Sequence, residues 1–228
     1  FDVRSSIGDD LPLFANLGIA QIEEVLDQKS FSKVSEMVKS LKADGLIIHV
    51  NPFQEWIQPG GDKITKTPLE IIRAFLDNFN LPVIVKEVGQ GFGPESIKNL
   101  LELPIESIEF GAFGGTNFSL LELLRRTDSK ELYEPLVNIG HSAEEMVQMI
   151  NSLIDTIDNS QVKSVIISGG VRNYLDGYYL INKINMPAVY GQASSFLKYA
   201  MGDYSVLSEY VDSQIKGFKM ANSFLKVR

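Results

Sequence analysis

A cluster of polar side chains follows one short apolar segment of the sequence. The segment Gly45–His49 is aliphatic and predicts a buried strand, and Asn51, Gln54 and Glu55 come soon after it. Parallel α/β sheets place their binding sites at the carboxyl ends of strands. Oxygen atoms of carboxylates and carboxamides are the ligands that Mg²⁺ prefers, so Asn51 and Glu55 are candidate magnesium ligands. The segment therefore predicts a ligand site.

The two histidines lead to different expectations. A lone histidine at a strand end is more often a hydrogen-bonded structural group than an acid–base catalyst, but the polar residues around His49 favour a role in the site. His141 precedes a predicted helix in which Ser142 is the N-cap and Glu145 completes a capping box. We therefore expect His141 to contribute to the N-terminus of that helix.

Glycine-rich loops follow three of the later predicted strands. Ser168–Arg172 follows the strand Ser164–Ile167, and Gly191–Ser194 follows the strand Ala188–Tyr190. Glycines let backbone N–H groups approach an anion closely, and the dipole of a following helix favours negative charge. The loop Gly114–Asn117 also offers N–H groups and a hydroxyl at a strand end, but ordinary tight turns have the same composition, because glycine and asparagine favour turns. The loops after the last two strands together predict a phosphate site.

Lys86 lies near the end of the otherwise apolar predicted strand Pro82–Val88. A buried lysine is costly unless it pairs with an acid or reaches a functional cavity. Its candidate partners are the adjacent Glu87 and Glu109 on the next predicted strand. Both explanations stay open at this point.

The composition excludes several classes of function. The 228 residues carry a net charge of −8, which argues against a nucleic-acid surface because such surfaces need clustered lysine and arginine. The sequence contains no cysteine, which excludes disulfides, a thiol nucleophile and a thiolate metal site. No apolar run is long enough to span a membrane, so no membrane association is expected. A cytoplasmic location is compatible with these features.

Predicted strands and helices alternate along the chain, which is the pattern of a parallel α/β fold. We find no linker or repeat, so residues 1–228 are expected to form a single domain. Six βα units with glycine-rich loops after the last two predict a (β/α)8 TIM barrel of which two units are absent. A doubly wound open sheet is the competing architecture. The remaining predicted elements are strands at Leu13–Gly18 and Ser107–Phe110 and helices at Gln21–Leu26, Phe31–Lys42, Pro68–Phe79, Pro94–Leu101, Ala143–Asp155 and Asp203–Leu225.

The polar cluster and the glycine loops together resemble a known family, the FMN-dependent type 2 isopentenyl-diphosphate Δ-isomerases. The most specific part of the resemblance is the His-x-Asn-Pro-x-Gln-Glu run at His49–Glu55 joined to Lys-Glu-Val-Gly at Lys86–Gly89. The other matching motifs occur in the family's order. They are Ala15–Gly18, Gln58-Pro59 with Gly61-Asp62, Gly114–Phe118 and Ser168–Val171.

The resemblance implies a TIM barrel that interconverts isopentenyl diphosphate and dimethylallyl diphosphate in isoprenoid biosynthesis. It also implies reduced FMN and Mg²⁺ as cofactors, NADPH as the reductant and assembly into a homo-oligomer.

The resemblance also carries over roles for single residues. Gln54 matches the glutamine that contacts the substrate, and Glu55 matches the carboxylate that binds magnesium. His49 and Asn51 match the polar residues that lie beside these two at the diphosphate. Gln54 and His49 are the catalytic candidates, and Asn51 is a second candidate metal ligand. The residues that match flavin contacts are Asn16, Lys86, Thr116, Gly169, Gly170, Val171, Ala193 and Ser194.

Two other functions remain as alternatives. Family members usually have a glutamate where this chain has Gly60, so loop order or diphosphate contacts are expected to be weaker. A non-catalytic FMN- or phosphate-binding remnant is therefore one alternative. An FMN-dependent 2-hydroxy-acid oxidoreductase shares the barrel and the lysine. It needs a histidine base and an arginine where this chain has Phe113–Thr116. We rank that alternative lower.

The resemblance leads to a prediction about a polypeptide that begins at Phe1. The family has about a hundred more residues before this point, and they supply two barrel strands, since such barrels typically need about 250 residues. Without those strands the sheet has unpaired edges. We expect such a polypeptide to be inactive and poorly loaded with FMN, as measured by turnover and flavin absorbance. Full turnover by the purified 228-residue polypeptide would overturn this expectation.

Overall fold

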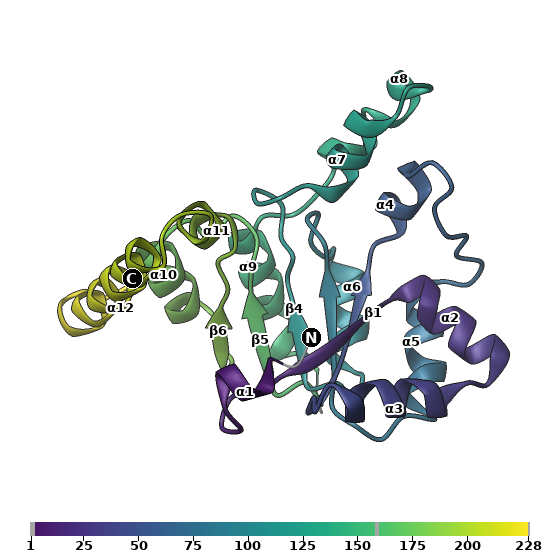
Figure 1. The fold of residues 1–228 in the computed structure, drawn as a ribbon, viewed down its shortest axis with the longest axis horizontal. Coiled ribbons are helices and arrows are strands. Elements are labelled where there is room, and N and C mark those ends of the chain that lie inside the picture. The colour runs from purple at the N-terminus through teal and green to yellow at the C-terminus, as the bar shows by residue number, and fades with distance from the viewer. Residues whose placement is uncertain (1–2, 158–159, 228) are drawn as a thin grey trace.

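The computed structural model describes residues 3–157 and 160–227, so Phe1 and Asp2 lie outside the described residues. The described residues form a six-stranded parallel sheet in the order β1-β2-β3-β4-β5-β6 (Figure 1). The strands are β1 (Phe14–Gly18), β2 (Gly45–Val50), β3 (Val83–Glu87), β4 (Ser107–Glu109), β5 (Ser164–Ile167) and β6 (Ala188–Tyr190).

Helices fill the connections between the strands. Those of the first half are α1 (Arg4–Ile7), α2 (Ile19–Gln28), α3 (Phe31–Ser40), α4 (Pro52–Ile57), α5 (Pro68–Leu76) and α6 (Pro94–Leu101). Those of the second half are α7 (Phe118–Arg125), α8 (Lys130–Tyr133), the 3₁₀ turn η1 (Leu136–Asn138), α9 (Ala143–Ile154), α10 (Tyr174–Lys183), α11 (Ser194–Ala200) and α12 (Tyr204–Phe224).

The strand order decides between the two predicted architectures. Each strand pairs with the next one in the sequence, without the reversal of order that defines a doubly wound sheet. Sequential parallel strands joined by helices are consecutive units of a (β/α)8 barrel. The predicted partial barrel is confirmed, and the open doubly wound sheet is wrong.

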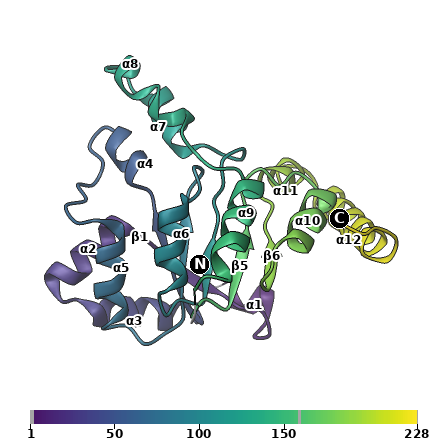
Figure 2. The same cartoon turned by 180° about the vertical axis from the view of Figure 1, so that it is seen from behind.

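The two faces of the sheet have different surroundings. One face is covered by α5, α6 and α9, which lie in front of the strands in Figure 2. Ile48, Val85 and Ile108 point toward these helices and are fully buried in the main hydrophobic core. His49 and Lys86 alternate with these apolar residues, so they point to the opposite face and are only partly buried. The polar residues therefore lie on the face that would be the interior of a closed barrel.

Most predicted elements are present, with ends shifted by a few residues. No helix is among the predicted elements directly after the second strand, but Pro52–Ile57 is helix α4, with Pro52 at its first position. Proline is favoured there because its missing N–H has no partner in the first turn. The helices α7 and α8 between β4 and β5 were also not predicted. Within the described ranges, no helix has both the length and the apolar character needed to cross a membrane.

The capping box predicted for helix α9 is present and leads to a test. Ser142 accepts a hydrogen bond from the Glu145 N–H at 3.3 Å, and the Glu145 carboxylate accepts one from the Ser142 N–H at 2.7 Å. We expect Ser142→Ala to lower the free energy of unfolding by about 1 kcal/mol and the melting temperature by roughly 2–4 °C. Ser152→Ala on the exposed side of the same helix is the control. Equal effects of the two substitutions would contradict the role of the cap.

Candidate functional site

One row of polar side chains crosses three neighbouring strands. The strand register pairs His49 with Lys86 and Lys86 with Glu109, so all three point to the same face near the carboxyl ends of their strands. At one end of the row, the Asn16 side chain of β1 lies 3.1 Å from His49 Nδ1. At the other end, the Ser168 hydroxyl donates to Glu109 Oε1 at 3.1 Å. The row thus runs from β1 to the loop after β5.

Burial and mutual charge shift the pKa values along this row. Burial is the main cause that lowers the pKa of His49, and the positive charge of Lys86 lowers it further. Burial also lowers the pKa of Lys86 and raises that of Glu109, although each charge stabilises the other. Both members of this pair therefore shift toward their neutral forms, because the cost of desolvation exceeds their attraction. Such shifted groups are typical of functional sites.

Adjacent Lys86 and Glu87 point to opposite faces of β3, so Glu109 is the candidate partner on the same face as Lys86, although both carboxylates stabilise the lysine charge. Glu87 Oε2 instead accepts hydrogen bonds at 2.6–2.9 Å from four successive backbone N–H groups, those of residues 88–91. Burial raises the pKa of Glu87, and these four bonds oppose the rise. Glu87 therefore shapes the loop between β3 and α6.

Helix α4 brings the other predicted site residues together. The Asn51 amide donates to Glu55 Oε1 at 2.8 Å and to Gln54 Oε1 at 3.2 Å. The second oxygen of Glu55 accepts from the Asp62 N–H at 2.9 Å. Asn51 is buried, and its Oδ1 atom has no hydrogen-bond partner among the described residues. An oxygen in that position is an unused acceptor beside a carboxylate.

This arrangement fits a magnesium ion held by few protein atoms. Asn51 Oδ1 and the Glu55 carboxylate are the available oxygens, and Mg²⁺ commonly keeps water and substrate phosphate in its other positions. Among the described residues, no group of three or more histidine and carboxylate side chains is placed to hold a metal. The predicted pair Asn51 and Glu55 therefore remains the candidate set.

Sequence reasoning missed Gln21, which connects this cluster to the first strand. Its Oε1 atom accepts from the Gly18 N–H at 2.8 Å, and its Nε2 atom donates to Asp62 at 2.8 Å. The only local signal is a glutamine three residues after the N-cap Gly18, which is the capping-box position. A Cβ at Gly18 would lie 2.8 Å from His49 Nε2, so glycine is needed there.

The loops after β4 and β5 lie against each other through glycines. A Cβ at Gly115 would lie 3.1 Å from the Gly170 nitrogen and 3.2 Å from the Gly169 Cα atom. Gly169 and Gly170 have φ values of 87° and 75°, a region that glycine adopts without strain. The backbone N–H groups of Gly169 and Gly170 are thus accessible where a phosphate would need donors. These residues fit the flavin phosphate that the resemblance implies.

The other predicted cofactor residues lie at the same edge of the sheet, with differing exposure. Thr116 is exposed in the loop after β4, and Ala193 and Ser194 are exposed at the start of α11. The neighbouring Ser195 hydroxyl donates to the carbonyl of Arg172 at 2.9 Å, which joins the loops after β5 and β6. The Val171 side chain is buried in the core, so only its backbone is available to a ligand.

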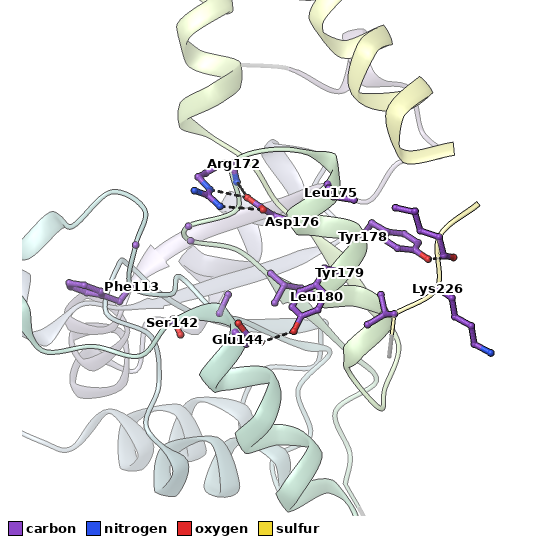
Figure 3. A pocket seen from close by; sticks show the side chains of 16 residues that line it. Phe113, Ser142, Glu144, Arg172, Leu175, Asp176, Tyr178, Tyr179, Leu180 and Lys226 are labelled. Atoms are coloured by element: carbon purple, nitrogen blue, oxygen red, sulfur yellow. Dashed lines mark hydrogen bonds and ion pairs between the residues drawn. The ribbon is translucent and has the colours of Figure 1, made fainter. Parts of the chain in front are cut away.

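The well-formed grooves of the described residues lie beside this row rather than on it. One groove of about 890 Å³ runs between α9, α10 and the chain after α12, and Gly169 and Gly170 line its edge. Figure 3 shows that several polar groups of this groove are already paired, Arg172 with Asp176 and Glu144 with the Tyr179 hydroxyl. Neither Lys86 nor Gln54 lines it. The row from Asn16 to Ser168 therefore lies outside this groove.

Comparison with known proteins supplies the relationship that the geometry suggests. Over 223 residues the chain is 31% identical to proteins named isopentenyl-diphosphate delta-isomerase from Rickettsia africae (strain ESF-5) and Rickettsia bellii (strain RML369-C). The chain is homologous to the isopentenyl-diphosphate delta-isomerases. The match covers 96% of this chain and 61% of each relative, so the chain spans about three fifths of their length.

Two further comparisons add little to this relationship. No family model matches the chain. A solved structure of a mandelate oxidase mutant with a monooxide FMN adduct is similar with a TM-score of 0.47 and 13% identity, over 91% of this chain and 56% of that one. A likeness of this strength supports no statement about function. The resemblance to the isomerases was predicted from the sequence and is confirmed by the curated relatives.

The electrostatic coupling along the row gives a test with a definite sign. The positive charge of Lys86 lowers the pKa values of both His49 and Glu109, so Lys86→Met is expected to raise both. Side-chain NMR titration measures the two values directly. Lys39→Met, on exposed helix α3, is the charge-matched control and should leave them unchanged. A fall in either pKa, or no change, would show that the row is not coupled in this way.

Proposed function

We propose that the protein of which this chain is part interconverts isopentenyl diphosphate and dimethylallyl diphosphate, using reduced FMN and Mg²⁺. The observation that carries the proposal is the homology to curated isomerases over 96% of the chain, together with the row His49–Lys86–Glu109 beside Asn51, Gln54 and Glu55. Reduction by NADPH and assembly into a homo-oligomer belong to the same proposal.

The reaction moves a double bond by adding a proton at one carbon and removing one from another. An unactivated alkene is a weak base, so the site must orient it and exclude water. The Gln54 carboxamide does not titrate, and its role is therefore to orient the alkene. It is held for this role by the Asn51 amide at 3.2 Å.

His49 and Asn51 are proposed to bind the diphosphate. Burial lowers the pKa of His49 and so favours the neutral ring, in which one nitrogen donates a hydrogen bond and the other accepts one. The contact with Asn16 at Nδ1 fixes the orientation of the ring. A neutral donor binds phosphate oxygens without adding a proton-transfer competitor to the site.

The two bound groups would supply the remaining chemistry. Reduced FMN supplies an electron-rich ring and an exchangeable proton at one place, and Mg²⁺ supplies positive charge for the diphosphate. Asn51 and Glu55 would hold the metal. Lys86 would place its charge beside the flavin, where it favours the anionic reduced form. The backbones of Gly169, Gly170 and Val171, with Ala193 and Ser194, would hold the flavin phosphate.

A non-catalytic flavin- or phosphate-binding protein is the second candidate. It is favoured by the glycine at Gly60, where family members usually have a carboxylate, and this position is exposed. The 2-hydroxy-acid oxidoreductase is less favoured, because Phe113 and Thr116 replace the histidine and arginine that its chemistry needs.

Anaerobic turnover of isopentenyl diphosphate with FMN, reductant and Mg²⁺ tests the proposal, using the protein with its natural N-terminus. We expect Gln54→Ala to lower kcat by roughly 100-fold, because a misplaced reactant loses that much. Gln28→Ala, an exposed glutamine on α2, should have normal kcat. Normal kcat in Gln54→Ala would remove Gln54 from the mechanism. FMN binding without turnover in the unmodified protein would favour the second candidate.

A further inference from the structure

The connection between β4 and β5 forms an arm that stands at the carboxyl edge of the sheet beside α4 (Figure 1). The arm consists of α7, α8 and the turn η1. Helix α4 has only six residues, and it carries Gln54 and Glu55. A helix this short is not stable by itself and depends on packing for its position.

Arg126 of the arm contacts the end of α4 directly. Its NH1 group donates to the carbonyl oxygen of Ile57, the last residue of α4, at 2.5 Å. The last carbonyls of a helix lack partners within the helix and carry partial negative charge, so a guanidinium is a favourable partner. Among the described residues, Arg126 is the only side chain that donates a hydrogen bond to the Ile57 carbonyl.

The rest of the arm fixes the Arg126 side chain in this position. The Asp128 carboxylate accepts from its NH2 group at 3.2 Å, and the guanidinium carbon lies 4.8 Å from the centre of the Tyr133 ring. The Arg126 side chain is only 12% exposed. A planar guanidinium makes these contacts simultaneously, whereas the ammonium group of lysine does not.

Apolar packing accompanies the polar contact. Ile57 is fully buried and forms a small cluster with Leu123 and Val137, separate from the main core, with Tyr133 packed against it. The cluster and the Arg126 bond join α4 to the arm at the end opposite to Asn51. The position of α4 is therefore fixed at both ends, by the chain at Asn51 and by the arm at Ile57.

We propose that Arg126 is a positioning residue that holds α4, and through it Gln54 and Glu55, in the orientation that binds magnesium and substrate. This inference rests on the proposed function for its kinetic part. Its structural part, that Arg126 limits local unfolding of helix α4, is independent of that function. Arg126 itself contacts neither candidate ligand group in the described residues.

The experiment compares the full-length protein with its Arg126→Gln and Arg126→Lys variants. Lys130→Gln is the matched control, because it removes one positive charge from an exposed position of the same arm. Hydrogen exchange reports on the amides of Glu55 and Gln58, which donate to Asn51 and Gln54 carbonyls at 3.1 and 2.9 Å. Kinetics are measured at a temperature at which circular dichroism shows every variant to be fully folded.

We expect Arg126→Gln to increase exchange of these two amides at least tenfold, to raise the Mg²⁺ concentration for half-maximal activity, and to lower kcat roughly 10- to 100-fold. FMN affinity should be unchanged, since the glycine loops are not touched. Arg126→Lys should fall between Arg126→Gln and the unmodified protein, and Lys130→Gln should match the unmodified protein.

Each other outcome has a distinct meaning. Unchanged exchange and unchanged kinetics in Arg126→Gln would overturn the inference, and so would equal losses in Lys130→Gln. A proportional loss of FMN binding and folding would show a merely structural role and also overturn it. Absence of turnover in the unmodified protein would overturn the proposed function, whereas faster exchange of the α4 amides in Arg126→Gln would still support the anchoring of α4.

Discussion

The alignment of parallel strands is the constraint on which the rest of this structure depends. In-register pairing brings His49, Lys86 and Glu109 to the same height along their strands, although they lie far apart in the sequence. Because side chains alternate between faces, the same register places Ile48 and Val85 against the helices. A site of interacting charges and a continuous apolar core are thus produced by one hydrogen-bonding pattern.

The sequence was most informative where local chemistry marks an element's ends. The bounds of α6 were predicted to the residue, because Pro94 starts it and an apolar stripe continues to Leu101. The short helix α4 was not predicted, since a segment of six residues that starts with proline is too short to show helical periodicity. Its helical state becomes evident only from its packing against α7.

The candidate site was predictable in its parts and not in its connections. His49, Asn51, Gln54 and Glu55 were identified from their spacing and from a resemblance to a family. Arg126 has no comparable signature, because its partner is a backbone carbonyl that only the tertiary structure brings near. A side chain that acts on a distant carbonyl leaves no pattern in its neighbouring residues.

Strand β3 carries a lysine and a glutamate side by side on opposite faces, and this has a consequence for how the chain selects its alignment. If β3 slipped by one position relative to β2, the Lys86 ammonium would enter the layer between sheet and helices. The Glu87 carboxylate would at the same time turn to the face that His49 and Lys86 now share. A misaligned sheet would thus bury an ammonium group without a partner beneath the helices. The alternation of Lys86 and Glu87 therefore disfavours a one-residue slip of β3.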